Sequence, residues 1–123
     1  MFTFKIEGKR YSPEILIDGK SQRIEIKGSS MLDDASWFYS SVLKWVVAFN
    51  KYEDSATTFN IRLDQVNKSS RKWIMLIVRK LSVILPNHQV IVNWYYQSND
   101  KAMQLNGERL KLESMLPVNI IAA

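Results

Sequence analysis

The sequence predicts a single α/β domain in which a mixed β-sheet packs against about three helices. Short segments of alternating polar and apolar residues gather near the N-terminus, and strand-like and helix-like patterns alternate along the rest of the chain. The length of 123 residues suits one hydrophobic core, because two cores would each approach the lower size limit for stable folding. We therefore expect residues 1–123 to form one domain.

Three period-two segments predict the first strands of the sheet: Phe2–Ile6, Glu14–Asp18 and Arg23–Lys27. Residues 19–22 separate the second and third, and Asp18-Gly19 supplies the turn of a β-hairpin. The hairpin has one buried side if its apolar residues share a face, namely Ile15, Ile17, Ile24 and Ile26. Gly28-Ser29-Ser30 then ends the extended pattern.

Apolar residues at three- and four-residue intervals predict two helices that face the sheet. The first starts at Asp33-Asp34, whose carboxylates suit a helix N-terminus, and runs to about Lys51. Its inner stripe is Phe38, Val42, Trp45, Val46 and Phe49. The second helix, Arg71–Leu85, ends at Pro86-Asn87 because proline lacks the amide proton that a helix needs. Its inner stripe is Trp73, Leu76, Ile77, Leu81 and Ile84.

Two strands flank the second helix in the predicted order of elements. They are Thr57–Leu63 and Val90–Tyr95, and a crossover of this kind makes the two strands parallel. Because Val90–Tyr95 is mostly apolar, we expect it at the centre of the sheet with both faces covered.

The C-terminal part predicts a third helix, Lys101 to about Lys111, capped by Ser98-Asn99-Asp100. Gly107 weakens this helix, and its packing candidates are Met103, Leu105 and Leu110. Pro117–Ile121 is expected to form either a last edge strand or a docked extended segment.

Reactive side chains are too few to predict a catalytic or metal site. The chain has no cysteine, which excludes disulfides, thiolate metal sites and a cysteine nucleophile. The only histidine, His88, lies in an expected surface turn, and the isolated glycines form no phosphate-binding loop. Asp33-Asp34 could hold a divalent ion, although helix capping accounts for the pair. We therefore expect a non-enzymatic protein with no catalytic residue, cofactor or metal.

The N-terminal residues and the scattered basic residues favour other proteins as partners over a membrane or a nucleic acid. Met1–Arg10 contains no apolar block of the length that a signal peptide or membrane span needs, so we expect a cytoplasmic protein that does not bind membranes. The formal charge of +5 raises the alternative of a nucleic-acid partner. The basic pairs are scattered, which favours an ordinary solvated surface: Lys9-Arg10, Arg71-Lys72 and Arg79-Lys80.

The junction at residues 67–70, before the second predicted helix, is chemically suited to control by phosphorylation. Asn67-Lys68-Ser69-Ser70 places two hydroxyl groups at the start of the second helix, where unpaired amides and the helix dipole favour negative charge. A phosphoryl group there would add about two negative charges and about three acceptor oxygens. The alternative is simple N-capping by Ser69 or Asn67, and the residues alone favour this interpretation.

Several short motifs have an order and spacing that match a known family: Ser12-Pro13, Ile26-x-Gly28-x-Ser30, Phe38-Tyr39, Trp45, Asn67-Lys68-Ser69-Ser70, Val92-x-Trp94-x-Tyr96, Asn99-Asp100-x-x-Met103 and Gly107-Glu108. On these motifs the sequence resembles the SiaC-type bacterial regulatory phosphoproteins from Tyr11 to about Leu116. The resemblance implies a fold like the STAS-type anti-sigma-factor antagonists. It also implies partner switching. Such a protein is phosphorylated by an anti-sigma-type kinase, is dephosphorylated by a metal-dependent serine/threonine phosphatase, and when unmodified binds and activates a diguanylate cyclase.

The sequence departs from this family at the phosphoacceptor. The resemblance implies a threonine acceptor within Asn-Thr-Ser-Ser, and this position is Lys68 here, which has no hydroxyl group. The usual phosphorylation is therefore impossible at this position. Residues 32–35, Leu-Asp-Asp-Ala, also differ from the Pro-Glu-Asn-Ser of the family.

Three hypotheses follow for the function. In the first, the protein has lost phospho-control and binds a signalling partner constitutively, with Lys68 adding a positive charge at the contact. In the second, control has moved to Ser69 or Ser70. Both hypotheses share one set of expected partner-binding residues: Asn67, Lys68, Ser69, Ser70 and Arg71. The third is a basic nucleic-acid-binding domain that uses Arg71, Lys72, Tyr95 and Tyr96, although the scattered charge argues against it.

Overall fold

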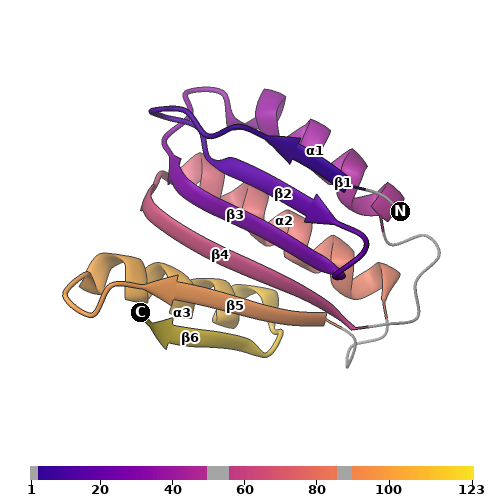
Figure 1. The fold of residues 1–123 in the computed structure, drawn as a ribbon. Helices are drawn as coiled ribbons and strands as arrows, with labels where there is room; N and C mark the ends of the chain where they lie inside the picture. Colours follow the sequence, from indigo (N-terminus) through magenta and orange to yellow (C-terminus); the bar gives the residue numbers. More distant parts are fainter. Residues whose placement is uncertain (1–2, 50–55, 86–89) are drawn as a thin grey trace.

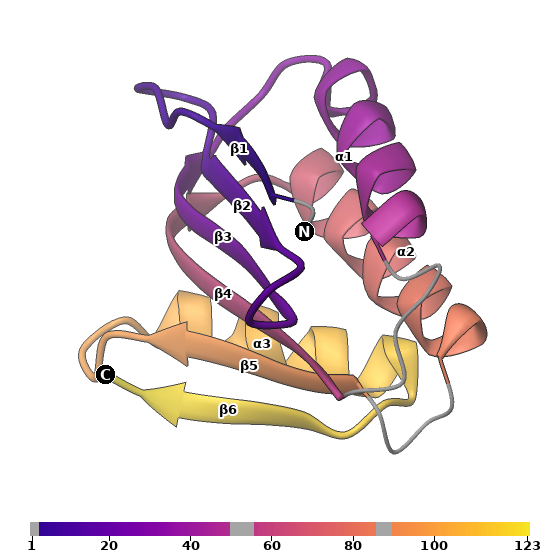
Figure 2. The ribbon, with the colours of Figure 1, turned by 45° about the vertical axis from the view of Figure 1, so that its right-hand side comes forward.

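A computed structural model describes residues 3–49, 56–85 and 90–123. A six-stranded sheet in the order β1-β2-β3-β4-β5-β6 has three helices on one of its faces (Figures 1 and 2). The elements are β1 (Thr3–Ile6), β2 (Glu14–Asp18), β3 (Arg23–Ser30), α1 (Ala35–Phe49), β4 (Thr57–Val66), α2 (Lys68–Ile84), β5 (Val90–Tyr96), α3 (Lys101–Ser114) and β6 (Val118–Ala122). The predicted fold class, an α/β domain with a mixed sheet and three helices, is confirmed.

The N-terminal strands form an antiparallel meander, as the period-two pattern predicted. In the β2–β3 hairpin, Ile15 pairs with Ile26 and Ile17 pairs with Ile24, and all four are at most 1% exposed. Within the turn, the residue with a left-handed backbone is Gln22 (φ 54°). The Asp18 carboxylate accepts bonds from the Lys20 amide and the Ser21 hydroxyl, which lowers its pKa, and the Ser21 bond is the main cause.

The C-terminal strands are parallel, and β6 is an edge strand, which decides between the two predicted forms of the tail. The expected central position of β5 is wrong, because β5 is second from the edge. Its expected cover on both faces is also wrong. Trp94 is buried on the face that carries the helices, whereas Ile91 on the opposite face is 40% exposed. Since the described helices all lie on one side, the apolar composition of β5 does not mean double burial.

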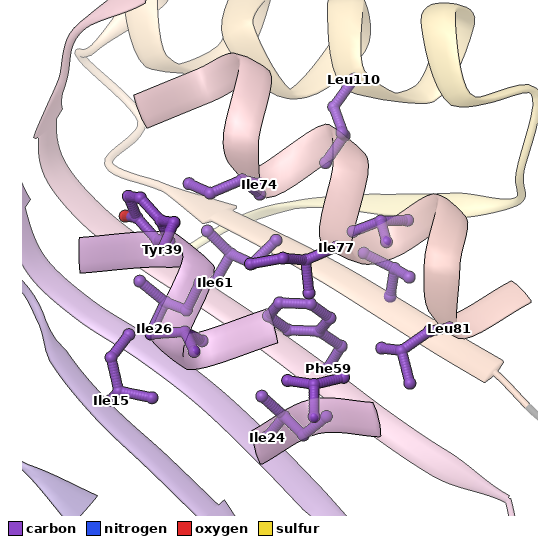
Figure 3. Close-up of a cluster of buried hydrophobic side chains, with 14 of the residues drawn as sticks. Ile15, Ile24, Ile26, Tyr39, Phe59, Ile61, Ile74, Ile77, Leu81 and Leu110 are labelled. Carbon is purple, nitrogen blue, oxygen red and sulfur yellow. The ribbon is translucent and has the colours of Figure 1, made fainter. Parts of the chain in front are cut away.

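The core lies between the sheet and the helices (Figure 3). Phe59 and Ile61 of β4 meet Ile77 and Leu81 of α2, and each of these four side chains is fully buried. The predicted inner stripe of α2 is rotated in the structure. Its buried apolar residues are Ile74, Ile77, Val78 and Leu81, whereas Leu76 is 47% exposed and Trp73 and Ile84 are half-buried.

The other two helices also correct individual predictions. In α1, Phe38, Val42 and Val46 are buried as expected, but Trp45 is 41% exposed and stacks on Phe4 with ring centroids 4.6 Å apart. In α3, Leu105 is 62% exposed and so does not belong to the core, whereas Met103 and Leu110 do.

Gly107, which was expected to weaken α3, lies where this helix crosses β5. A Cβ atom at this position would lie 2.4 Å from Cδ1 of Trp94. Trp94 donates a hydrogen bond from Nε1 to the Met103 carbonyl at 2.9 Å. The glycine therefore permits close contact between helix and sheet at a position where every other residue would meet the indole ring.

Two boundaries that matter for the site differ from prediction. Strand β3 does not end at Gly28 but continues to Ser30 through a register shift, in which Gly28 pairs with Leu63 and Ser29 pairs with Gln65. Helix α2 begins at Lys68 and not at Arg71. Several predictions concern residues outside the described part of the chain, namely Phe2, the helix end near Lys51, Pro86-Asn87 and the turn at His88; the burial of Phe49 is likewise not described.

Candidate partner-binding site

The start of α2 is capped by Asn67, which follows directly after β4. Asn67 has an extended backbone (φ −91°, ψ 171°), and its Oδ1 accepts a hydrogen bond from the Ser70 amide at 2.9 Å. Its Nδ2 donates to the Leu32 carbonyl at 2.9 Å, so the same side chain also fixes the segment before α1. Of the two capping candidates from the sequence, Asn67 is therefore the cap, and Ser69 lies inside the first turn.

The predicted site residues divide into an exposed and a buried set. Lys68 and Ser69 are exposed, Asn67 and Arg71 are half-buried, and the Ser70 side chain is 0% exposed. Arg71 forms an ion pair with Glu113 of α3, with Nη1 and Oε1 3.6 Å apart. Only Lys68 and Ser69 are thus fully presented to another molecule at this corner.

Ser70 belongs to a buried hydroxyl cluster that sequence reasoning did not identify. Ser30 Oγ donates to Ser70 Oγ at 2.8 Å and lies 2.6 Å from the Tyr39 hydroxyl. The three groups come from β3, α1 and α2, so they join the ends of three elements beneath the exposed corner. The sequence holds no signal for this cluster, because hydroxyl residues 40 positions apart, such as Ser30 and Ser70, show no periodicity.

Burial raises the pKa of Tyr39 to about 12, although hydrogen bonding with Ser30 and Ser70 opposes the change. Since the folded pKa exceeds the ordinary value of 10.0, the protein keeps the neutral hydroxyl that the unfolded chain would lose. The stability that the neutral Tyr39 hydroxyl contributes to the folded protein is fully present below pH 10 and is lost as the pH rises towards 12.

We expect Tyr39→Phe to remove part of the stability loss at alkaline pH. Urea unfolding between pH 9 and 11.5 should show a steeper decline for the unchanged protein than for the variant, by up to about 2 kcal/mol at the alkaline end. The exposed Tyr11→Phe serves as the control, since it lies outside the hydroxyl cluster and is 56% exposed. Parallel pH profiles for the unchanged protein and Tyr39→Phe would contradict the assignment.

The residues of the nucleic-acid hypothesis do not form one surface. Arg71 and Lys72 lie on α2, on the helical side of the sheet. Tyr95 lies on the opposite face, since the neighbouring Trp94 points to the helices, and Arg62 covers its ring at 3.6 Å from the centroid. Tyr96 shares the helical side with Trp94, but its side chain is half-buried against the core. Neither tyrosine therefore presents a fully exposed ring beside Arg71 and Lys72.

Within residues 3–49, 56–85 and 90–123, no three acidic, histidine or cysteine side chains gather in a way that could hold a metal ion. None of the helices in these ranges combines the length and the apolar character that a bilayer crossing requires.

Comparison with known proteins agrees with this fold. Residues 6–123 match the family model of the SiaC family regulatory phosphoproteins. The crystal structure of apo-SiaC from Pseudomonas aeruginosa superposes with a TM-score of 0.87 at 24% identity, covering 99% of this chain and 100% of that one. A chain of the crystal structure of the diguanylate cyclase SiaD in complex with its activator SiaC, from the same organism, gives 0.85 at 24% identity, covering 98% and 99%. No curated protein matches the sequence.

Proposed function

This chain belongs to the SiaC family of regulatory phosphoproteins, and on that premise we propose that it is a non-enzymatic, cytoplasmic member of a partner-switching system. In this proposal the unmodified protein binds and activates a diguanylate cyclase. An anti-sigma-type kinase and a metal-dependent serine/threonine phosphatase control it. One neighbouring structure is a SiaC protein bound to the cyclase SiaD, which it activates, and this supports the choice of partner.

The observation that carries the proposal is the exposed corner at the start of α2. Lys68 and Ser69 project from a helix whose first turn is fixed by the Asn67 cap and by the buried hydroxyl of Ser70. A partner would therefore meet a preorganised surface, which reduces the entropy cost of binding. We assign partner contact to Lys68, Ser69 and Arg71, with Asn67 and Ser70 holding them in place.

The exposure of the two serines favours Ser69 over Ser70 as the phosphoacceptor, on the premise from the family resemblance that Lys68 stands at the acceptor position. Ser69 is exposed in the first helical turn, where the dipole and free amides stabilise a phosphate. Ser70 is 0% exposed and bonded to Ser30, so a kinase could reach it only after local unfolding. We therefore propose that control in this protein acts through Ser69.

Incubation with the anti-sigma-type kinase of the same organism and Mg-ATP should add one phosphate, as measured by intact-mass spectrometry. Ser69→Ala should abolish the modification, whereas Ser70→Ala should retain it. A phosphate that persists on Ser69→Ala would assign the acceptor elsewhere. No mass change in the unchanged protein would favour constitutive binding without phospho-control.

Activation is tested separately by adding the purified protein to a diguanylate cyclase from the same organism and following the synthesis of cyclic di-GMP. We expect the unmodified protein to raise the rate in a saturable manner. A protein that neither binds the cyclase nor changes its rate would contradict the proposed function.

A further inference from the structure

A groove between α2 and α3 begins at the same exposed corner. It has a volume of about 440 Å³, and its wall includes Lys68, Arg71 and Lys72 from α2 and Arg109 and Glu113 from α3. Four of these five charged side chains are positive. The groove therefore concentrates basic residues that appear scattered along the sequence.

The single carboxylate of the groove does not neutralise these cations. Glu113 is engaged by Arg71 at 3.6 Å, and its backbone carbonyl accepts a bond from Arg79 at 2.5 Å. Within the described parts of the chain, no carboxylate lies at ion-pairing distance from Lys68, Lys72 or Arg109. Three positive charges are thus left available to an external anionic group.

Apolar side chains lie among these charges. Leu76 lines the groove and is 47% exposed. Met75, the residue before it, is half-buried and also lines the groove. Accessible apolar side chains beside basic groups are typical of surfaces that bind an amphipathic partner.

We propose that this groove binds an acidic amphipathic segment of the signalling partner, with carboxylates on Lys68, Lys72 and Arg109 and apolar residues on Met75 and Leu76. The proposal rests on the proposed function and names its docking surface. Charge complementarity selects an acidic occupant, and the apolar wall of Met75 and Leu76 selects a polypeptide over a free anion. A nucleic acid fits less well, because the exposed groups beside these cations are aliphatic and provide no stacking surface for bases.

The same geometry explains how modification of Ser69 would act. Lys68 lines the groove and Ser69 is the next residue along the chain, so a phosphate on Ser69 places about two negative charges at the groove entrance. This phosphate repels the acidic segment and competes for the lysines. Phosphorylation and partner binding thereby exclude each other without any change of fold.

The test measures the affinity of the full chain for the diguanylate cyclase by isothermal titration, with a double charge reversal in the groove, Lys72→Glu with Arg109→Glu. We expect a loss of about tenfold or more, because several charge pairs at one interface become repulsive. The matched control reverses two exposed lysines elsewhere, Lys20→Glu with Lys44→Glu, and should change affinity by less than about threefold. Circular dichroism confirms that both variants are folded.

A second pair of variants separates apolar contact from charge. Leu76→Ser should weaken cyclase binding severalfold, whereas Val47→Ser, a change at a similarly exposed aliphatic residue on α1, should not. If the unchanged protein binds the cyclase and the groove variants bind like their controls, the docking surface is wrong and the proposed function stands.

If the unchanged protein does not bind the cyclase, both the function and its docking surface are overturned. Nucleic acid is the other occupant to be tested, by fluorescence anisotropy with a labelled DNA duplex and a labelled RNA oligonucleotide. Tight binding that falls steeply with salt and is lost in the groove variants would assign the groove to nucleic acid and overturn the proposal.

Discussion

Replacing Gly107 by alanine is expected to destabilise the protein by about 3 kcal/mol, which is typical of severe overpacking in a core. The new methyl group would lie 2.4, 2.7 and 2.8 Å from Cδ1, Cγ and Nε1 of Trp94. The indole ring is 1% exposed and its Nε1 is bonded to Met103, so it has little room to move. Equilibrium urea unfolding measures the effect.

The direction in which Gly107→Ala changes the free energy of unfolding is informative. Glycine to alanine within a helix ordinarily stabilises by about 1 kcal/mol, and the contact with Trp94 must reverse that gain. Glu108→Ala, one residue further on the exposed side of α3, is the matched control and should change stability by less than about 0.5 kcal/mol. Adding Trp94→Leu should make Gly107→Ala almost harmless. A stable Gly107→Ala protein with an intact Trp94 would contradict the close packing.

The strands could be predicted because their pattern is local. In β2 and β3 the alternation of isoleucine with polar residues gives the buried face directly, and the hairpin turn then sets which isoleucines pair. Strand β5 shows the limit of this reasoning. Its run of apolar residues predicts burial but not how many faces are covered, because that depends on where all three helices pack.

The inner face of α2 could not be read reliably from the sequence. The segment Trp73–Val78 is apolar at every position, so several helical stripes satisfy the same periodicity. The sheet selects the stripe of Ile74, Ile77 and Leu81 and leaves Leu76 in the groove wall. The choice is made by tertiary contacts, and the exposed leucine became visible as part of a surface only with the structure.

In the candidate site, the sequence identified the exposed start of α2 but not the buried hydroxyl cluster that supports it. The helix start and its preference for negative charge follow from Asn67 and the serines that come after it. The support comes from Ser30, which the sequence assigned to a break after β3, and from Tyr39, which appeared only in a family motif. A strand that continues through an irregular register and a buried tyrosine hydroxyl have no local signature.

The two neighbouring serines are expected to respond in opposite ways to a negative charge. Ser70→Glu should destabilise the protein by about 3 kcal/mol or more, because it buries an unpaired carboxylate. It also breaks the hydrogen bond between Ser70 and Ser30, which joins the start of α2 to β3. Ser69→Glu places the same charge in solvent at the helix N-terminus and should stabilise by about 0.5 kcal/mol.

Urea unfolding of both variants measures this difference, and Ser70→Ala provides a milder change if Ser70→Glu does not fold. Ser70→Ala should cost about 1–2 kcal/mol, since it leaves a buried hydroxyl of the cluster without its partner. Equal stabilities for Ser69→Glu and Ser70→Glu would contradict the burial of Ser70. A phosphate on Ser70 would then be compatible with the fold, and Ser69 would lose its advantage as the acceptor. The expected difference makes Ser69 the only one of the two positions where a phosphate changes the partner surface and leaves the fold intact.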